Sequence, residues 1–166
     1  MAFSTSAVFR EFIKATLGDG QTAHTFPGSY AGLTADTLNV ALYGNGGSPD
    51  KDAAVASTGY NTGAWATANQ VTDTNWAAAG RPLASKAFTT PSTGVVMFDA
   101  ADTASNGTVT LANVYGCLVY DDTIASSTGG VADQGVSFHY FGGAQSVTGG
   151  TFTVVWNANG LFRVTV

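Results

Sequence analysis

Residues 149–166 read GGTFTVVWNANGLFRVTV, and this stretch decides the class of fold. Two runs of apolar and β-branched residues flank a turn signal at 157–160, which is the pattern of a β-hairpin. Apolar residues recur at every second position in both runs, so one side of each strand is suited to a core. We expect the core sides to carry Phe152, Val154 and Trp156 on the first strand and Phe162, Val164 and Val166 on the second.

The run at 161–166 also raises the question of its neighbours. A bare strand at the edge of a sheet is an aggregation hazard, because its unpaired backbone groups can pair with another chain. We therefore expect an interior strand, with 151–156 on one side and an earlier strand or another subunit on the other. Arg163 falls on the side opposite Phe162 and is expected at the surface.

Short runs with strand character recur through most of the remaining chain, and turns rich in Gly, Asn and Ser separate them. Almost no helical pattern lies between these runs, so the chain is predicted to be all-β. This spacing favours an antiparallel β-sandwich or jelly roll. Besides the closing pair, the predicted strands are 37–43, 84–89, 94–99, 108–111, 114–120 and 136–141.

The N-terminal segment is the exception. Residues 4–20 read STSAVFREFIKATLGDG, with capping residues at the start and Gly18 as a stop signal. Phe9, Phe12 and Ile13 recur at helical spacing, so we expect a short α-helix. Its apolar face either packs on the chain's own core or docks on a partner. The predicted organisation is an N-terminal helix and arm at 1–33, followed by one β-sandwich domain at 34–166.

Composition limits the class of partner. Charged residues make up only 10% of the 166 residues, against about 25% in an average domain, and the net charge is −5. The six basic residues are scattered, which argues against a nucleic-acid partner. No apolar stretch approaches the length of a membrane span, so no membrane partner is expected. The lone Cys117 lies in an apolar run and is interpreted as a buried structural thiol.

Catalytic and metal-binding patterns are not found in the sequence. His24 and His139 do not stand at metal-ligand spacing, and Glu11 is the only glutamate. Asp121 and Asp122 follow a predicted strand and are interpreted as the start of a solvated turn. The clusters at 45–52 and 99–107 have the chemistry of turns rather than the spacing of a calcium loop. The chain is therefore predicted to be no enzyme and to need no cofactor or metal.

Residues 44–80 form a predicted long loop with few aliphatic residues and three large aromatic ones. A loop this long is usually functional or becomes ordered against a partner. Aromatic side chains are enriched at protein interfaces and also stack on sugar rings, and the protein interface is favoured here. The interface candidates of the whole chain are Phe9, Phe12, Ile13, Tyr60, Trp65 and Trp76.

Several segments together suggest a family. The predicted N-terminal helix, LNVALY at 38–43, GYNTGAW at 59–65, LVYDD at 118–122 and the closing stretch at 141–166 occur in this order. As a set they resemble the capsid decoration, or cement, proteins of tailed bacteriophages, which are small β-sandwich virion proteins. The resemblance spans nearly the whole chain, and its most specific part is the pair GGTFTVVW and GLFRVTV.

The resemblance implies a function. Proteins of this family decorate the outer surface of the capsid as homotrimers and stabilise it by contacts with the major capsid protein, after assembly in the host cytoplasm. Similar modules also occur in phage tails and fibres. The alternative expectation is therefore an adhesive module on a tail, fibre or head surface that binds a host glycan or protein.

Overall fold

The computed structural model describes residues 3–10, 12, 32–124 and 131–165. All strand pairs in these residues are antiparallel, which confirms the predicted all-β class. A five-stranded main sheet has the order β1-β8-β7-β2-β3. Its strands are β1 (Ala7–Val8), β2 (Leu38–Tyr43), β3 (Arg81–Pro82), β7 (Val109–Asp121) and β8 (Gln134–Gly150).

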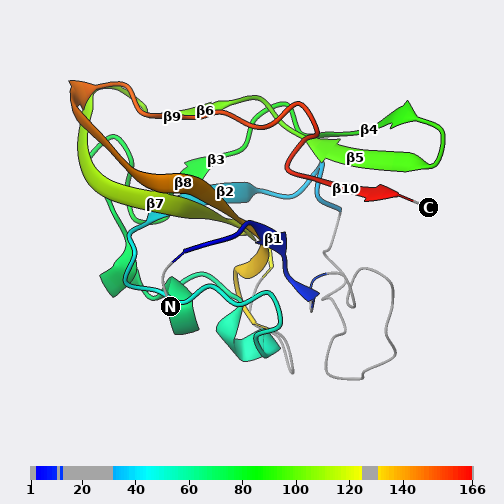
Figure 1. The fold of residues 1–166 in the computed structure, drawn as a ribbon, viewed down its shortest axis with the longest axis horizontal. Helices are drawn as coiled ribbons and strands as arrows, with labels where there is room; N and C mark the ends of the chain where they lie inside the picture. Colours follow the sequence, from blue (N-terminus) through cyan, green and yellow to red (C-terminus); the bar gives the residue numbers. More distant parts are fainter. Residues whose placement is uncertain (1–2, 11, 13–31, 125–130, 166) are drawn as a thin grey trace.

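Two smaller sheets accompany the main sheet, one to its right and one above it in Figure 1. The first, which we call the small sheet, has the order β10-β5-β4 and projects to one side. Its strands are β4 (Ala87–Ser92), β5 (Val95–Asp99) and β10 (Phe162–Thr165). The second is a two-stranded pair of β6 (Thr103–Ala104) and β9 (Thr153–Val154).

The centre of the main sheet is covered on both faces. All six residues of β2 are buried, as are the last six of β7, residues 116–121. A strand with two buried faces reads as a continuous apolar run, which is the pattern of LNVALY. On one face Trp65 contacts Tyr43 and Phe138, with ring centroids 5.2 Å and 5.6 Å apart. On the other face Trp156 packs against His139 at 5.1 Å.

The hairpin of β7 and β8 is far longer than an average strand pair and bends over the upper layer (Figure 1). Its pairing shifts register at four places, and each shift bends the ribbon. Asn113, Gly142 and Gly143 have positive φ values of 56°, 79° and 152° in this region. The irregular backbone therefore lets one hairpin contribute to both layers.

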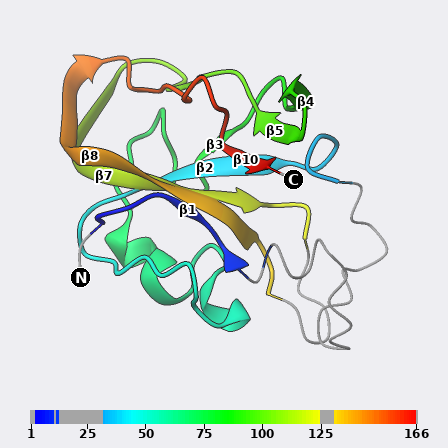
Figure 2. The same cartoon turned by 45° about the vertical axis from the view of Figure 1, so that its right-hand side comes forward.

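The start of the predicted N-terminal helix is wrong. Ala7 and Val8 form β1, paired with Phe138 and Ser137 of β8 at the edge of the main sheet (Figure 2). The Phe9 backbone N–H continues this pairing by donating to the Val136 carbonyl at 3.2 Å. Pairing with β8 thus outweighs the helical pattern at Ala7 and Val8. Arg10 and Phe12 have helical backbone, and the other residues of the predicted helix, 11 and 13 onward, lie outside the described residues.

The predicted long loop at 44–80 is folded onto the main sheet. It contains three short 3-10 helices, η1 (Val55–Ser57), η2 (Gly63–Trp65) and η3 (Thr67–Asn69), which lie below the main sheet in Figure 1. Isolated bridges at Tyr43–Gln70 and Asp73–Trp76 fix its later part. Trp65 and Trp76 of this segment belong to the core, and Tyr60, Ala64 and Val71 pack against it.

The predicted closing hairpin is wrong in its pairing. The turn at 157–160 does form, with the Gly160 N–H donating to the Asn157 carbonyl at 2.7 Å. The strands on either side then separate, because β9 pairs with β6 whereas β10 pairs with β5. Long-range bonds hold them apart: the Trp156 N–H donates to Asp102 Oδ1 at 2.9 Å, and the Leu161 N–H to the Phe98 carbonyl at 2.9 Å.

The predicted core faces of that hairpin are correct only in part. Val154 and Trp156 are buried, and Phe152 and Phe162 are partly buried. Val164 is exposed, and Val166 lies outside the described residues. The position of β10 explains the error, because it is an edge strand whose one paired neighbour among the described strands is β5. The expected neighbour at 151–156 is therefore wrong, and within the described residues β10 is not an interior strand.

Candidate protein-interaction surface

The structure places most of the predicted interface residues in the chain's own core. Phe9, Phe12, Trp65 and Trp76 are 0–2% exposed. Phe9 and Trp65 contact each other and Phe138, and the Trp76 indole N–H donates to the Val40 carbonyl at 3.2 Å. The interpretation of these four residues as contacts for a partner is therefore corrected. Ile13 lies outside the described residues.

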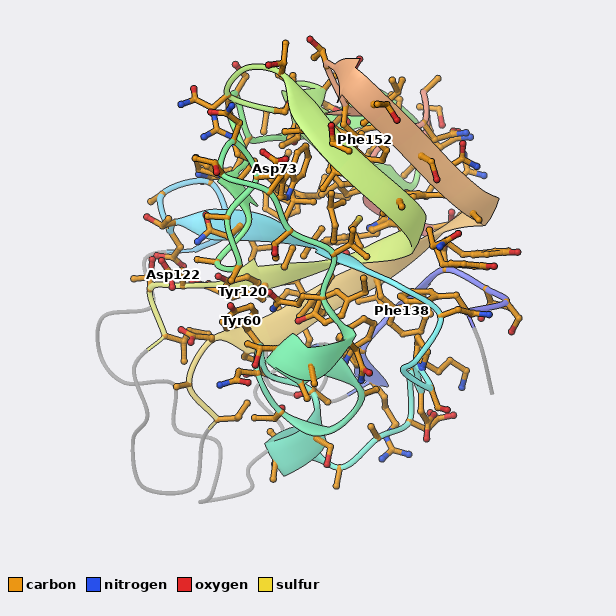
Figure 3. All side chains as sticks on the ribbon, turned by 90° about the vertical axis from the view of Figure 1, so that its left-hand side faces the viewer. Tyr60, Asp73, Tyr120, Asp122, Phe138 and Phe152 are labelled. Carbon is orange, nitrogen blue, oxygen red and sulfur yellow. The ribbon has the colours of Figure 1, made fainter. Side chains whose placement is uncertain are left out.

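Tyr60 is half-buried and is the remaining candidate. Its ring stacks on Tyr120 with centroids 4.6 Å apart, and Figure 3 shows the two side by side. The Tyr120 hydroxyl donates to the Ala79 carbonyl at 2.6 Å, and burial raises the pKa of Tyr120. Tyr60 thus covers a fixed tyrosine of the main sheet, and its ring is occupied within the chain.

A different surface holds the exposed apolar side chains. Among the described residues the exposed large hydrophobic side chains are Phe88, Val96, Val155 and Val164, at 50%, 39%, 70% and 45%. All of these except Val155 belong to the small sheet. The sequence does not indicate this surface. The pattern of 84–99 predicts two strands, but it does not show whether another part of the chain covers their apolar face.

Strand register shows that these side chains share one face. Phe98 lies opposite both Phe162 and Phe88, and Val96 lies opposite Val164. Directly opposed residues project from the same side of a sheet, as do residues two positions apart on one strand. The apolar face of the small sheet therefore consists of Phe88, Val96, Phe98, Phe162 and Val164.

Phe98 anchors this face to the rest of the molecule. Its side chain is 0% exposed, and its ring lies 5.0 Å from Phe88 and 5.4 Å from Phe162. Phe162 in turn contacts Phe12 at 6.3 Å. Phe98 and Phe162 are thus packed against the rest of the molecule, while Phe88, Val96 and Val164 are exposed.

The opposite face of the small sheet is more polar. Arg163 lies opposite Met97, which lies opposite Thr89 on β4, and Thr165 lies opposite Val95. The Arg163 guanidinium donates to Asn159 Oδ1 at 2.9 Å, within the turn that leads into β10. The small sheet therefore has one apolar and one mixed face, as expected for a sheet that contacts protein on one side.

Catalytic geometry is not found at the described histidine. His139 Nε2 lies 2.9 Å from Ser137 Oγ, but Ser137 is 0% exposed, so this hydroxyl cannot reach a substrate. Burial lowers the pKa of His139 to about 4, which keeps the ring neutral at pH 7. Cys117 is buried, as predicted. In the part of the chain that the structure describes, no group of three His, Cys, Asp or Glu residues is arranged to hold a metal ion.

Asp121 does not begin a solvated turn, which corrects its interpretation from the sequence. It is 0% exposed, and Asp36 beside it is 2% exposed. Burial, together with the neighbouring charge of Asp36, raises the pKa of Asp121 to about 7, although the Thr123 N–H donates to its Oδ1 at 2.9 Å. Asp122 is exposed and lies at the end of β7 in Figure 3. No sequence signal distinguishes these two adjacent residues except the alternation of the strand.

A pocket of about 250 Å³ lies between β8 and the segment that follows β9. Its lining includes Ser6, His139, Tyr140, Trp156 and Asn157. The Trp156 side chain is only 9% exposed, and its indole N–H donates to the Ala101 carbonyl at 3.1 Å. The pocket therefore offers polar groups but not an open tryptophan face.

Comparison with family models, with curated proteins and with solved structures found no match. Among the described residues, no helix is both long enough and apolar enough to cross a membrane.

Proposed function

We propose that this chain is a structural virion protein of a tailed bacteriophage, which decorates the capsid and stabilises it by protein–protein contacts without catalysis. The observation that carries the proposal is the apolar face of the small sheet. Phe88, Val96 and Val164 gather there, whereas the aromatic residues of 44–80 are used within the core. Grouped apolar side chains at a surface are typical of a site for another protein.

Composition supports the same role. Only 10% of the residues are charged, so much of the surface is small and polar and is suited to close packing in an array. The net charge of −5 suits the outside of a shell better than an interior lined with nucleic acid. The β-sandwich assignment and the trimeric state are part of the proposal: the first comes from the spacing of the predicted strands, and the second from the resemblance to decoration proteins.

The proposed partner of the apolar face is the major capsid protein. A single footprint centred on a few side chains gives a weak contact. Three linked footprints of a homotrimer raise the effective concentration at the shell, so weak individual contacts combine into stable attachment. This requires that the three small sheets face the shell together.

The test is binding to undecorated particles. We expect Val96→Lys to abolish co-sedimentation with particles, because it places a charge in the centre of the apolar face. Its free energy of unfolding should stay within about 1 kcal/mol of the wild-type value. The control is Val155→Lys, which changes a valine outside the small sheet that is 70% exposed, against 39% for Val96. If Val96→Lys co-sediments like the wild type, the apolar face does not contact the shell.

The pocket beside β8 is the observation that favours the alternative, an adhesive module for a host glycan. Ser6, Tyr140 and Asn157 could donate hydrogen bonds to a sugar there. Because Trp156 has no open face, the capsid role is favoured. Under the alternative, Val155→Lys at the pocket rim would abolish attachment to host cells and Val96→Lys would not.

A further inference from the structure

The edges of the sheets differ in how well they are protected against strand addition. Natural edge strands are usually very short, carry proline or contain a bulge, because a regular open edge pairs with other chains. β1, β6 and β9 have two residues each, and β3 ends in Pro82. β4 contains Pro91 and a register shift between Thr89 and Ser92.

The outer edge of β8 beyond β1 is also protected. Gly142 and Gly143 interrupt its regular backbone with positive φ values. The Gln145 side-chain amide bonds weakly to the carbonyls of Phe141 and Gly143, both at 3.4 Å. These carbonyls are thus already engaged, and the strand is too irregular for a partner to follow.

β10 is the exception among the described edges. It has four residues, no proline, and an unbroken register with β5 from Phe162 to Thr165. Arg163, Val164 and Thr165 are all exposed, so no described segment covers these three residues of the strand. Its free side presents a regular row of backbone donors and acceptors.

We propose that β10 pairs antiparallel with β10 of a second copy of this chain, with Val164 opposite the same residue of that copy. This inference rests on the proposed function, in which the small sheet contacts the shell, and it adds a second copy of the chain as another partner of the same sheet. Pairing of two identical antiparallel strands is two-fold symmetric. It is therefore separate from the threefold contact of the proposed trimer and links one trimer to the next.

The alternation of β10 and the charge of Arg163 favour this register over two alternatives. With Val164 on the symmetry axis, Arg163 lies opposite Thr165 of the second copy, and the apolar faces of the two small sheets are continuous. Centring the pair on Arg163 would place like charges opposite each other, which is destabilising. A shift by one residue would set Arg163 opposite Val164 and mix the two faces.

The proposed register also joins the exposed valines. Val96 lies opposite Val164 within each copy, so the joined sheet carries a row of four valines across the axis. Each Val164 gains an apolar neighbour on its free side, which removes part of its 45% exposure. The contact thus pairs the free backbone groups of β10 and buries part of the Val164 side chain.

Cysteine cross-linking of the purified protein tests the pairing. Directly opposed residues have Cβ atoms about 4.5–5.5 Å apart, close to disulfide distance, whereas diagonal neighbours are about 7–8 Å apart. We expect Val164→Cys to give a disulfide-linked dimer as the main product under copper–phenanthroline oxidation. Arg163→Cys alone should not cross-link, whereas a mixture of Arg163→Cys with Thr165→Cys should. The native Cys117 is 0% exposed and does not interfere.

Val155→Cys is the control for random collision, because it is exposed away from the small sheet. If Val164→Cys cross-links no faster than Val155→Cys, β10 does not pair with itself. If Arg163→Cys alone cross-links as fast as Val164→Cys, the register is wrong. These outcomes are read without particles, so they do not depend on shell binding. Loss of shell binding in Val96→Lys without cross-linking of Val164→Cys would overturn this inference alone, and the reverse pattern would overturn the proposed function alone.

Discussion

At the residue scale, Asp121 is the least expected feature of the chain. A carboxyl group at the end of a strand is usually solvated, but this one is buried next to Asp36. Charging Asp121 therefore has a cost in the folded state, and the raised pKa of about 7 expresses that cost. In the unfolded chain the pKa returns to about 3.9.

The sign of the pH dependence follows from these two values. Because the folded state holds the Asp121 proton more tightly, this group's contribution to stability is full below about pH 4 and is lost as the pH rises through about 7. We expect Asp121→Asn to be more stable than the wild type at pH 8 by about 2–4 kcal/mol, since each pKa unit corresponds to about 1.4 kcal/mol. The difference should shrink at pH 4.

Urea unfolding of both proteins at pH 4 and pH 8 measures this difference. The asparagine keeps an Oδ1 acceptor for the Thr123 N–H, so the substitution removes the charge and little else. A variant less stable than the wild type at pH 8 would show that the Asp121 carboxylate is stabilised by a cation and would contradict the account.

At the element scale, Phe98 and Arg163 separate the two faces of the small sheet. Phe98 is 0% exposed between Phe88 and Phe162, so Phe98→Ala should lower the free energy of unfolding by about 3–5 kcal/mol. Arg163 is exposed and contacts Asn159, so Arg163→Ala should change the free energy by no more than about 0.5 kcal/mol.

Thermal unfolding of these two variants checks the face assignment. The melting temperature of Phe162→Ala should lie between those of Phe98→Ala and Arg163→Ala, because Phe162 is only partly buried and contacts Phe12 and Phe98. If Phe98→Ala has the same melting temperature as the wild type, Phe98 is not part of the core.

The closing strands show what can be predicted at this scale. Period-two alternation correctly marked Val154 and Trp156 as buried. It did not identify their partner strands, because β9 is positioned by contacts with Asp102 and β10 by contacts with Phe98, both more than 50 residues away. Local patterns carry no information about such distant partners, so Val164 was placed in a core that it does not reach.

At the scale of the whole molecule, the all-β class and the antiparallel pairing follow from short strands and frequent turns. The location of the proposed interface does not follow from the sequence. Trp65 and Trp76 stand in a segment with few aliphatic residues, which suggests exposure, yet the main sheet provides their contacts. Conversely, Val96 stands in an ordinary strand pattern and is exposed, because the outer part of the small sheet extends beyond the core (Figure 1).

The most direct test of the central claim is a reconstruction of the purified phage particle. The account predicts density for this chain on the outer surface of the shell, in many copies in fixed proportion to the major capsid protein. Val96 should face the shell, and β10 strands of neighbouring copies should meet at two-fold axes. Density confined to the tail tip, in a few copies per particle, would contradict the capsid role and favour the adhesive one.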